Sequence, residues 1–151
     1  MELTEEELAQ FKGLISGLQL IQIQPLSIHS DKPILGAISP GNQELTLSWN
    51  QAFAVDDPMK IGDSQIMLRP RYEFNAKLGE EQLFTHTSIF GILFGIQDRD
   101  AVDKALGTET VKKVFLEKQI MKTMWPILRQ QILDGMSRLG LPTIPLPWIV
   151  E

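Results

Sequence analysis

The stretch NAKLGEEQLFTHTSIFGILFGIQ, residues 75–97, decides the fold. Polar and apolar side chains alternate on both sides of LGEE, residues 78–81, where Gly79 can take the positive φ that a tight turn requires. This pattern predicts a β-hairpin. Residues 89–96, IFGILFGI, contain no polar side chain, so we expect the end of the second strand to be covered on both faces of the sheet.

Three segments upstream also repeat apolar residues with period two, as half-buried strands do. They are residues 18–29, 44–56 and 65–78. Pro70 interrupts the hydrogen-bond ladder of the last segment, which is therefore expected at an edge or at a bulge. Residues 34–43 carry the glycines and prolines of a loop. With the hairpin, these segments predict a four-stranded antiparallel meander, and Gly91 and Gly95 are positions where another backbone can approach its last strand.

After Asp98 the apolar period returns to about 3.6, and residues 110–139 form the longest stripe. This stripe predicts one long helix that bends at Pro126 and ends near Gly140. A continuous helix of this length would span about 45 Å, which exceeds the width of a compact chain of this size. We therefore expect another subunit to cover part of it. The residues that follow, 140–151, are rich in proline and predict an extended, stiff segment.

The chain is expected to consist of an N-terminal amphipathic helix, residues 1–17, and one α+β domain, residues 18–151. In the first part apolar residues recur at helical spacing, and Thr4 followed by Glu7 forms a capping box. Packing of this helix on its own domain is preferred over a detachable helix that binds a partner. The length of 151 residues suits a single core.

Composition excludes several classes of function. The net charge of −5 argues against a nucleic-acid partner, because phosphate binding needs clustered Lys and Arg. Residues 1–13 begin with acidic side chains, unlike a secretory signal, and the absence of cysteine fits a reducing cytoplasm. The longest apolar run is far shorter than the roughly 20 residues of a membrane-spanning helix. These features predict a cytoplasmic protein without a membrane span.

No pattern of catalytic or metal-binding residues stands out. His29 and His86 lie in strand patterns without a zinc-ligand spacing. Asp98, Asp100 and Glu109 occupy three places of a calcium-loop template that lacks its central glycine, so we expect these acids to cap helices instead. There is no nucleophile elbow, P-loop or dinucleotide fingerprint. We therefore expect a protein that is not an enzyme and holds no metal or cofactor.

Four motifs, in order, resemble the SecB family of export chaperones, which hold unfolded proteins for the secretion machinery. They are LGEE at residues 78–81, IFGILFGI at 89–96, WPILR at 125–129 and RLGLPTIPLP at 138–147. They stand where that family has a Leu-Gly-Glu-Glu turn, a Gly-Ile-Phe strand end, a Phe-Pro-Tyr-x-Arg helix and an Arg-Gly-x-x-Pro-x-Leu-x-Leu-x-Pro loop. The resemblance covers residues 18–150.

The resemblance implies an ATP-independent holdase that forms a homotetramer, a dimer of dimers, and acts in protein export. It places clients in apolar grooves between the sheet and the loop after the long helix. The candidate client-binding residues are Ile89, Phe90, Ile92, Phe94, Met124, Trp125, Leu141, Ile144, Leu146 and Trp148. It also implies docking of the SecA motor on the outer face of the sheet, with Leu78, Glu80 and Asp31 as candidates.

Three alternatives stay open. The family continues into a second helix and a tail that contacts SecA, whereas this chain ends at Glu151 and has an additional N-terminal helix. A SecB-like chaperone that serves another client, such as an antitoxin, therefore fits the sequence as well. A small α+β domain that binds one lipid or acyl chain between sheet and helix is a second alternative. An adaptor with one folded partner and no chaperone activity is a third.

Overall fold

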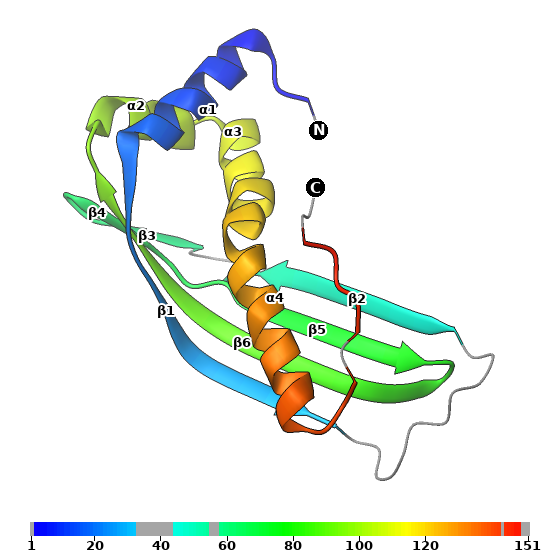
Figure 1. The fold of residues 1–151 in the computed structure, drawn as a ribbon. Helices are drawn as coiled ribbons and strands as arrows, with labels where there is room; N and C mark the ends of the chain where they lie inside the picture. Colours follow the sequence, from blue (N-terminus) through cyan, green and yellow to red (C-terminus); the bar gives the residue numbers. More distant parts are fainter. Residues whose placement is uncertain (1, 33–43, 55–57, 143, 149–151) are drawn as a thin grey trace.

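The computed structural model describes residues 2–32, 44–54, 58–142 and 144–148. It shows an α+β fold in which a long helix crosses one face of an antiparallel sheet and shorter helices gather at one end (Figure 1). In chain order the elements are α1 (Glu5–Gly17), β1 (Leu18–Asp31), β2 (Leu45–Ala52), β3 (Met59–Ile61), β4 (Gln65–Leu68), β5 (Arg71–Leu78), β6 (Glu81–Ile96), α2 (Arg99–Leu106), α3 (Glu109–Val114), the π-helical turn η1 (Phe115–Gln119) and α4 (Ile120–Arg138). The expected loop 34–43, residues 55 and 56 of the expected second strand, and residues 149–151 lie outside the described residues.

The sheet has six strands in the described chain, not the expected four. The difference arises where a predicted strand breaks. Arg69 and Pro70 separate β4 from β5, which pair with consecutive stretches of the same edge of β6. Along the next edge, β2 pairs with β5 and β3 pairs with β4. The irregularity expected at Pro70 is therefore present, and it divides one strand into two because proline cannot donate to the ladder.

The predicted meander is wrong for the first strand. β1 pairs antiparallel with β6, from Leu18 opposite Ile96 to Asp31 opposite Thr85. Consecutive strands β1 and β2 therefore lie at opposite edges of the sheet. This arrangement places the apolar end of β6 between β1 and β4, where both of its edges are hydrogen bonded. A strand as apolar as this one is best accommodated in the interior of a sheet.

Two bulges in β1 explain the pair of glycines in β6. The register shifts between Leu20 and Gln22 and again between Pro25 and Ser27. The two extra residues fold over the glycines: a Cβ on Gly95 would lie 3.1 Å from Ile21 Cδ1, and a Cβ on Gly91 would lie 3.5 Å from Leu26 Cδ1. Side chains from β1, and not a second backbone as expected, therefore make the close approach.

The hairpin between β5 and β6 is confirmed. Gly79 has φ of 62° in its turn, and burial alternates along β6, with Phe84, Phe90 and Ile92 buried beneath α4. The other face of β6 is only half-buried at residues 89–96. The expected cover on both faces is thus provided by the described chain on one face only.

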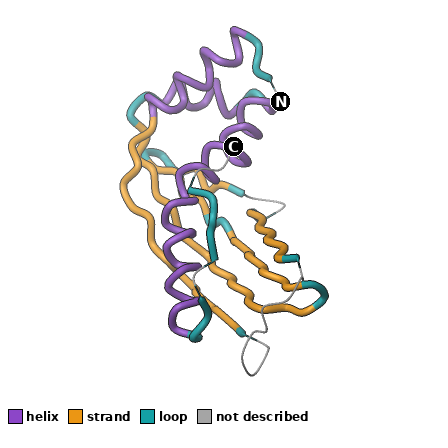
Figure 2. The backbone as a smooth tube through the Cα atoms, turned by 45° about the vertical axis from the view of Figure 1, so that its right-hand side comes forward, coloured by secondary structure: helices purple, strands orange, loops and turns teal. Residues whose placement is uncertain are grey.

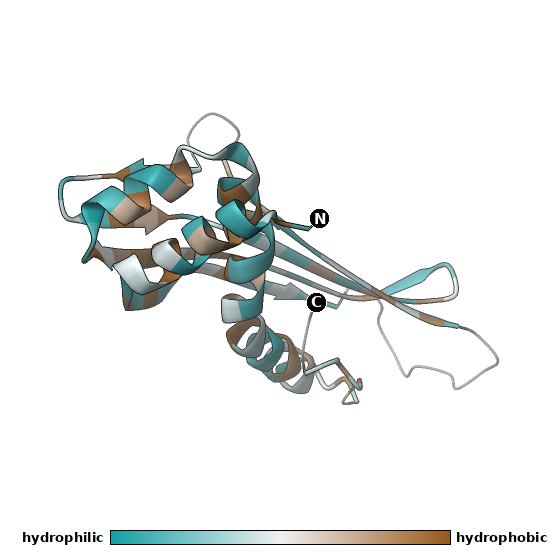
Figure 3. Cartoon of the chain, turned by 90° about the horizontal axis from the view of Figure 1, so that it is seen from above, coloured by the Kyte–Doolittle hydropathy of each residue, from teal (hydrophilic) through white to brown (hydrophobic). Residues whose placement is uncertain are grey.

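The N-terminal helix α1 begins as predicted. Thr4 Oγ1 accepts from the Glu7 amide at 3.1 Å, and the Thr4 amide donates to Glu7 Oε1 at 3.0 Å. Asp98 likewise caps α2 by accepting from the Ala101 amide at 3.1 Å. The helices α1, α2 and α3 pack against one another. Figure 3 shows apolar and polar bands alternating around these helices, as expected for helices with one covered face.

The predicted long helix consists of α3, η1 and α4 in succession. Its irregular turn is η1, whereas α4 remains α-helical through Pro126, where we had expected the bend. Phe115, the first residue of η1, packs against Phe94 of the sheet with ring centroids 6.0 Å apart. The helix ends at the predicted glycine, since Gly140 has φ of 73° and the Leu141 amide donates to the Met136 carbonyl at 2.9 Å.

Gly135 lets α4 lie directly on the sheet. A Cβ at this position would come within 2.5 Å of Ser30 Oγ on β1 and 3.1 Å of Phe84 Cζ on β6. These contacts are shorter than van der Waals distances, and both neighbours are held within the sheet. The absence of a side chain at Gly135 therefore sets the distance between α4 and β1.

Gly135→Ala should lower the free energy of unfolding by roughly 1–3 kcal/mol, because the added methyl group pushes α4 away from the sheet. Urea denaturation measures the change. Gly13→Ala in α1 is the matched control, since its Cβ would lie at an ordinary 3.7 Å from the Ala101 Cβ. It should be neutral or stabilising by up to about 1 kcal/mol. Equal effects of the two substitutions would contradict this close approach.

Candidate functional site

The candidate site is the seam where the tail, residues 141–148, lies along α4. Figures 1 and 2 show this segment beside the long helix, on the side that faces β2. Its described residues form no helix or strand. Leu141, Ile144 and Leu146 are nevertheless buried. An extended segment that buries aliphatic side chains without pairing in the sheet must lie in an apolar groove of the rest of the chain.

Two tryptophans form the centre of this groove. Trp125 of α4 lies against Trp49 of β2, with ring centroids 4.9 Å apart. Its indole Nε1–H donates to the Pro147 carbonyl at 2.7 Å. The tail is therefore held by aliphatic burial and by one short hydrogen bond to its main chain, which is how extended peptides are recognised independently of their exact sequence.

The structure brings some of the predicted client-binding residues together and separates others. Trp125, Leu141, Ile144 and Leu146 meet in the seam, and Trp148 follows them, 77% exposed. Others are buried in the core between the sheet and the helices, namely Phe90, Ile92, Phe94 and Met124. Ile89 is half-buried on the outer face of the sheet. The predicted set thus divides into groove, core and outer face.

Trp49 is the groove residue that the sequence interpretation missed as a site residue. Its segment, residues 44–56, was predicted only as a half-buried strand, and the place of Trp49 on β2 is consistent with that prediction. Its partner Trp125 is separated from it by about half of the 151-residue chain, so only the folded structure shows the pair. The available signal was one tryptophan in a segment with the period of a strand and another in a segment with the period of a helix.

The predicted SecA-docking residues lie at one end of the sheet. Leu78 and Glu80 belong to the turn between β5 and β6, and Asp31 ends β1 opposite Thr85 of β6. Glu80 and Asp31 are exposed, whereas Leu78 is partly buried. Leu78 lies on the inner face of β5, in phase with Phe74 and Ala76, and packs against the core, so it does not lie on the outer face that the resemblance implied.

Among the described residues, no group of three or more His, Cys, Asp or Glu side chains is arranged to hold a metal ion. No helix in the same part of the chain combines the length and the hydropathy needed to cross a membrane. The seam offers apolar surface and one hydrogen-bond donor, and binding is the chemistry that these groups support.

Comparison with known structures identifies the fold. A SecB-like chaperone from Mycobacterium tuberculosis, solved in complex with a peptide from an antitoxin, superposes with a TM-score of 0.64 over 94% of this chain and 98% of that one, at 19% identity. The fold is SecB-like. A structure of a protein of unknown function from Streptococcus agalactiae matches with a TM-score of 0.36, at 11% identity, over 86% of this chain and 96% of that one. No family model and no curated protein matches the sequence.

A buried polar layer lies in this SecB-like fold between β6 and α4. His86 is 1% exposed, and its Nδ1 lies 2.9 Å from Ser30 Oγ in a hydrogen bond. Burial lowers the pKa of His86, and exposed His29 lowers it further, while the nearby Gln131 amide opposes the shift. Neither His86 Nε2 nor Gln131 Oε1 completes a hydrogen bond. The ring is therefore held neutral in a polar but incompletely bonded environment.

Stability should consequently depend on pH through His86. Because its folded pKa lies below the ordinary 6.5, the unfolded chain binds this proton more tightly. Neutral His86 makes its full contribution to the free energy of unfolding well above pH 6.5. This contribution is lost as the pH falls through 6.5 towards the pKa of His86 in the folded chain. Urea denaturation between about pH 8 and pH 5.5 measures the slope. His86→Asn should flatten the dependence of stability on pH, and His29→Gln should preserve most of it. An unchanged slope in His86→Asn would contradict the assignment of the pH dependence to His86.

Proposed function

We propose that the protein is an ATP-independent chaperone that holds extended apolar segments of unfolded clients. The observation that carries this proposal is the tail seam, in which the chain binds an extended apolar segment of its own against Trp125 and Trp49. The SecB-like fold supports it. The Mycobacterium tuberculosis structure holds a peptide from an antitoxin, and an antitoxin is one candidate client for this chain too.

The tail occupies the position that a client would take. Burial of one aliphatic side chain stabilises the bound tail by about 1.5–3 kcal/mol at most. Three tail side chains are buried in this way, those of Leu141, Ile144 and Leu146. Ordering each tail residue costs roughly 1–2 kcal/mol. The two effects are of similar size, so the tail can leave the groove without nucleotide hydrolysis. A client segment with alternating aliphatic side chains then replaces it, and no chemical step on the client is involved.

We also propose that this activity belongs to the cytoplasm and can serve protein export. The acidic end of the sheet at Glu80 and Asp31, with Leu78 beside it, is the surface on which SecA would dock. Lys32, the residue after Asp31, donates to the Leu139 carbonyl at 3.3 Å, so this surface adjoins the start of the tail seam.

Ile144→Ser combined with Leu146→Ser should raise the apparent affinity for a client by roughly five- to tenfold, because the open groove is populated more often. The readouts are client affinity and the aggregation of an equimolar slow-folding protein without ATP. Glu80→Lys is the control: it should leave holding intact while weakening SecA binding. Wild-type protein without effect on aggregation would overturn the holdase proposal. Weaker binding by the tail variant would show that the tail is a wall of the groove and not its occupant.

We further propose that the chain assembles through the outer face of its sheet, in a homotetramer made of two dimers. An apolar patch lies there, defined as Ile21, Leu26, Met67, Ile89 and Leu93. Met67 and Leu93 are paired across β4 and β6, and Ile21 and Leu26 are the bulge residues over the glycines. Three of the five are exposed, Met67 by 49%. Amides surround the patch at Gln19, Gln22, Gln24 and Gln65, and two cations border it, Lys60 opposite Met67 and Arg71 opposite Ile89. The patch is therefore an apolar centre with a polar rim, as in many subunit interfaces.

Met67→Lys should shift the protein towards smaller assemblies, because it places a charge within the apolar patch. Sedimentation at micromolar concentration measures the change. Thr87→Lys is the matched control, since Thr87 lies on the same face of β6 but outside the patch. Wild-type protein that sediments as a monomer would contradict the assembly, and an unchanged mass in Met67→Lys would place the interface elsewhere.

A further inference from the structure

The tail seam contains a cation whose inner N–H the tail leaves unbonded. Arg129 of α4 is only partly exposed, and its Nε is buried without a hydrogen-bond partner. Within the described residues, Arg129 belongs to neither of the two ion pairs. A buried donor of a charged group without an acceptor costs stability, so its presence in this groove requires a reason.

Two hydrogen bonds place Arg129 beside the tail. The Leu141 amide donates to the Met136 carbonyl at 2.9 Å, and the Trp125 indole donates to the Pro147 carbonyl at 2.7 Å. The tail therefore runs antiparallel to α4 from the level of Met136 to that of Trp125, and Arg129 lies between these levels. Residues 125 and 129 also stand one turn apart on the same side of the helix. Arg129 thus faces the tail.

The tail has little slack between these two bonds. From residue 125 to residue 136, α4 rises about 16.5 Å at 1.5 Å per residue. Six residues of chain, from 141 to 147, span at most about 20–22 Å when fully extended. A segment of this length must pass close to Arg129.

The tail also shows which of its groups face α4. Ile144 and Leu146 are buried, whereas Pro145 and Pro147 are exposed. These side chains point alternately into the groove and to solvent, while the Pro147 carbonyl points sideways to Trp125. A segment in this groove therefore offers its main chain to α4, and in a strand the carbonyls of residues i and i+2 point to the same side.

The spacing of Trp125 and Arg129 fits such a strand. Four residues of α4 rise about 6 Å, and two residues of a strand advance about 6.6–6.8 Å. The tail makes the first bond and leaves Arg129 Nε without one. Prolines at positions 142, 145 and 147 fix φ near −65°, far from the value of about −140° in an antiparallel strand. The tail is therefore prevented from repeating its carbonyls with the period of a strand.

We propose that Arg129 is the second main-chain donor of the client groove. In a client that runs in the direction of the tail, Trp125 donates to one carbonyl and Arg129 donates to the carbonyl two residues earlier. The inference rests on the proposed function, and it adds a conformational preference for a strand-like segment without proline. Such a client gains a hydrogen bond that the tail lacks, which favours displacement of the tail.

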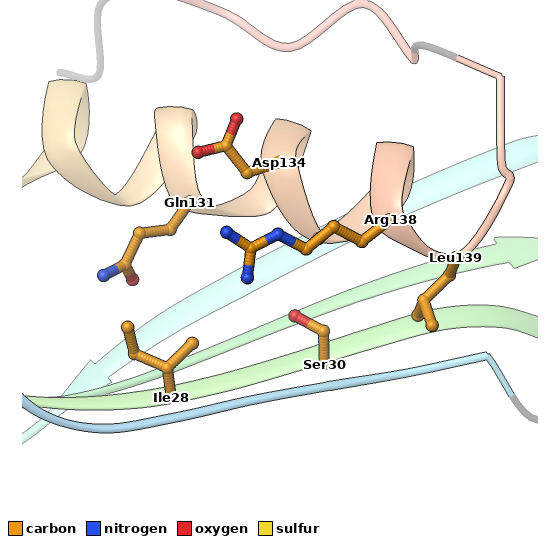
Figure 4. Close-up of a pocket in the computed structure, with 7 residues that line it drawn as sticks. Ile28, Ser30, Gln131, Asp134, Arg138 and Leu139 are labelled. Carbon is orange, nitrogen blue, oxygen red and sulfur yellow. The ribbon is translucent and has the colours of Figure 1, made fainter.

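Arg138 provides a matched cation on the opposite margin of α4. Figure 4 shows its guanidinium above Ser30 of β1, where it lines a cavity of about 310 Å³. Nine residues separate Arg138 from Arg129, which is about two and a half turns of helix. Arg138→Met therefore removes the same charge as Arg129→Met without touching the tail seam.

Two peptides test the proposal by fluorescence anisotropy. One has the sequence of residues 141–148, and the other has serine at each of its three proline positions. The serine peptide should bind about five- to tenfold more tightly, because it bonds to Arg129 as well as Trp125, although its greater flexibility opposes binding. Arg129→Met, which keeps the apolar stem, should abolish the difference, and Arg138→Met should preserve it. Equal binding of the two peptides to the wild-type protein would overturn the proposal.

A change in the peptide alone locates the bond. In the serine peptide, sulfur replaces the carbonyl oxygen at the position of Pro145, and sulfur is a weak acceptor. Affinity should fall at least threefold with the wild-type protein and stay unchanged with Arg129→Met. The same replacement at the position of Leu146 is the control, because that carbonyl points to the other side of an extended segment. Equal losses at the two positions would contradict the proposal.

Glutamate at the position of Pro145 separates main-chain from side-chain recognition. Its affinity should equal that of the serine peptide, since this side chain faces solvent. Tighter binding that depends on Arg129 would assign the guanidinium to a carboxylate and overturn the proposal. Aggregation of a slow-folding protein is measured in parallel. Suppression together with equal peptide affinities would refute this inference alone, whereas no suppression would refute the proposed function.

Discussion

The structure depends on the central position of β6. One face of this strand buries Phe84, Phe90 and Ile92 beneath α4, and its apolar end has β1 on one edge and β4 on the other. At an edge of the sheet, this end would expose both apolar side chains and unpaired backbone groups. Once β6 is central, β1 and β2 must occupy opposite edges, and α4 covers the one face on which the large side chains of β4, β5 and β6 converge. The proposed binding surface follows, because the tail seam is the margin of α4 towards β2.

The sequence could predict features whose cause is local. Gly79 and Gly140 have the positive φ that their turns require, and the bonds of Thr4 and Asp98 are made within three residues. The pairing of β1 with β6 could not be predicted in this way, since no periodicity reports which distant strand becomes a neighbour. The η1 turn was missed for a similar reason: Pro126 is the visible breaker, but α4 continues through it, and the irregular turn lies where Phe115 meets the sheet.

The candidate site could likewise be predicted only where its features have a local cause. The tail residues Leu141, Ile144 and Leu146 were predicted to be apolar and extended, and the structure buries them in the segment that bonds to Trp125. That the tail fills its own groove depends on a balance between burial and ordering, which sequence does not show. Arg138 was noted only as the first residue of the RLGLPTIPLP motif, because a cation on an exposed helix turn is ordinary until Gly135 brings β1 beneath it. Convergence of side chains from β1 and α4 is a property of the packed structure.

The two bulges of β1 also govern how this strand can change in length. Before the first bulge the residues facing α4 are Leu18 and Leu20, between the bulges they are Ile23 and Pro25, and after the second they are Ile28 and Ser30. The residues that face α4 therefore have even numbers before the first bulge, odd numbers between the bulges and even numbers again after the second bulge. Loss of either Ile21 or Leu26 alone would remove one bulge and leave every other pair between β1 and β6 in register, because each is the one residue of its bulge without a partner on β6. Among homologous chains, single deletions in this strand should accordingly occur at these two positions, each accompanied by a side chain in place of Gly95 or Gly91.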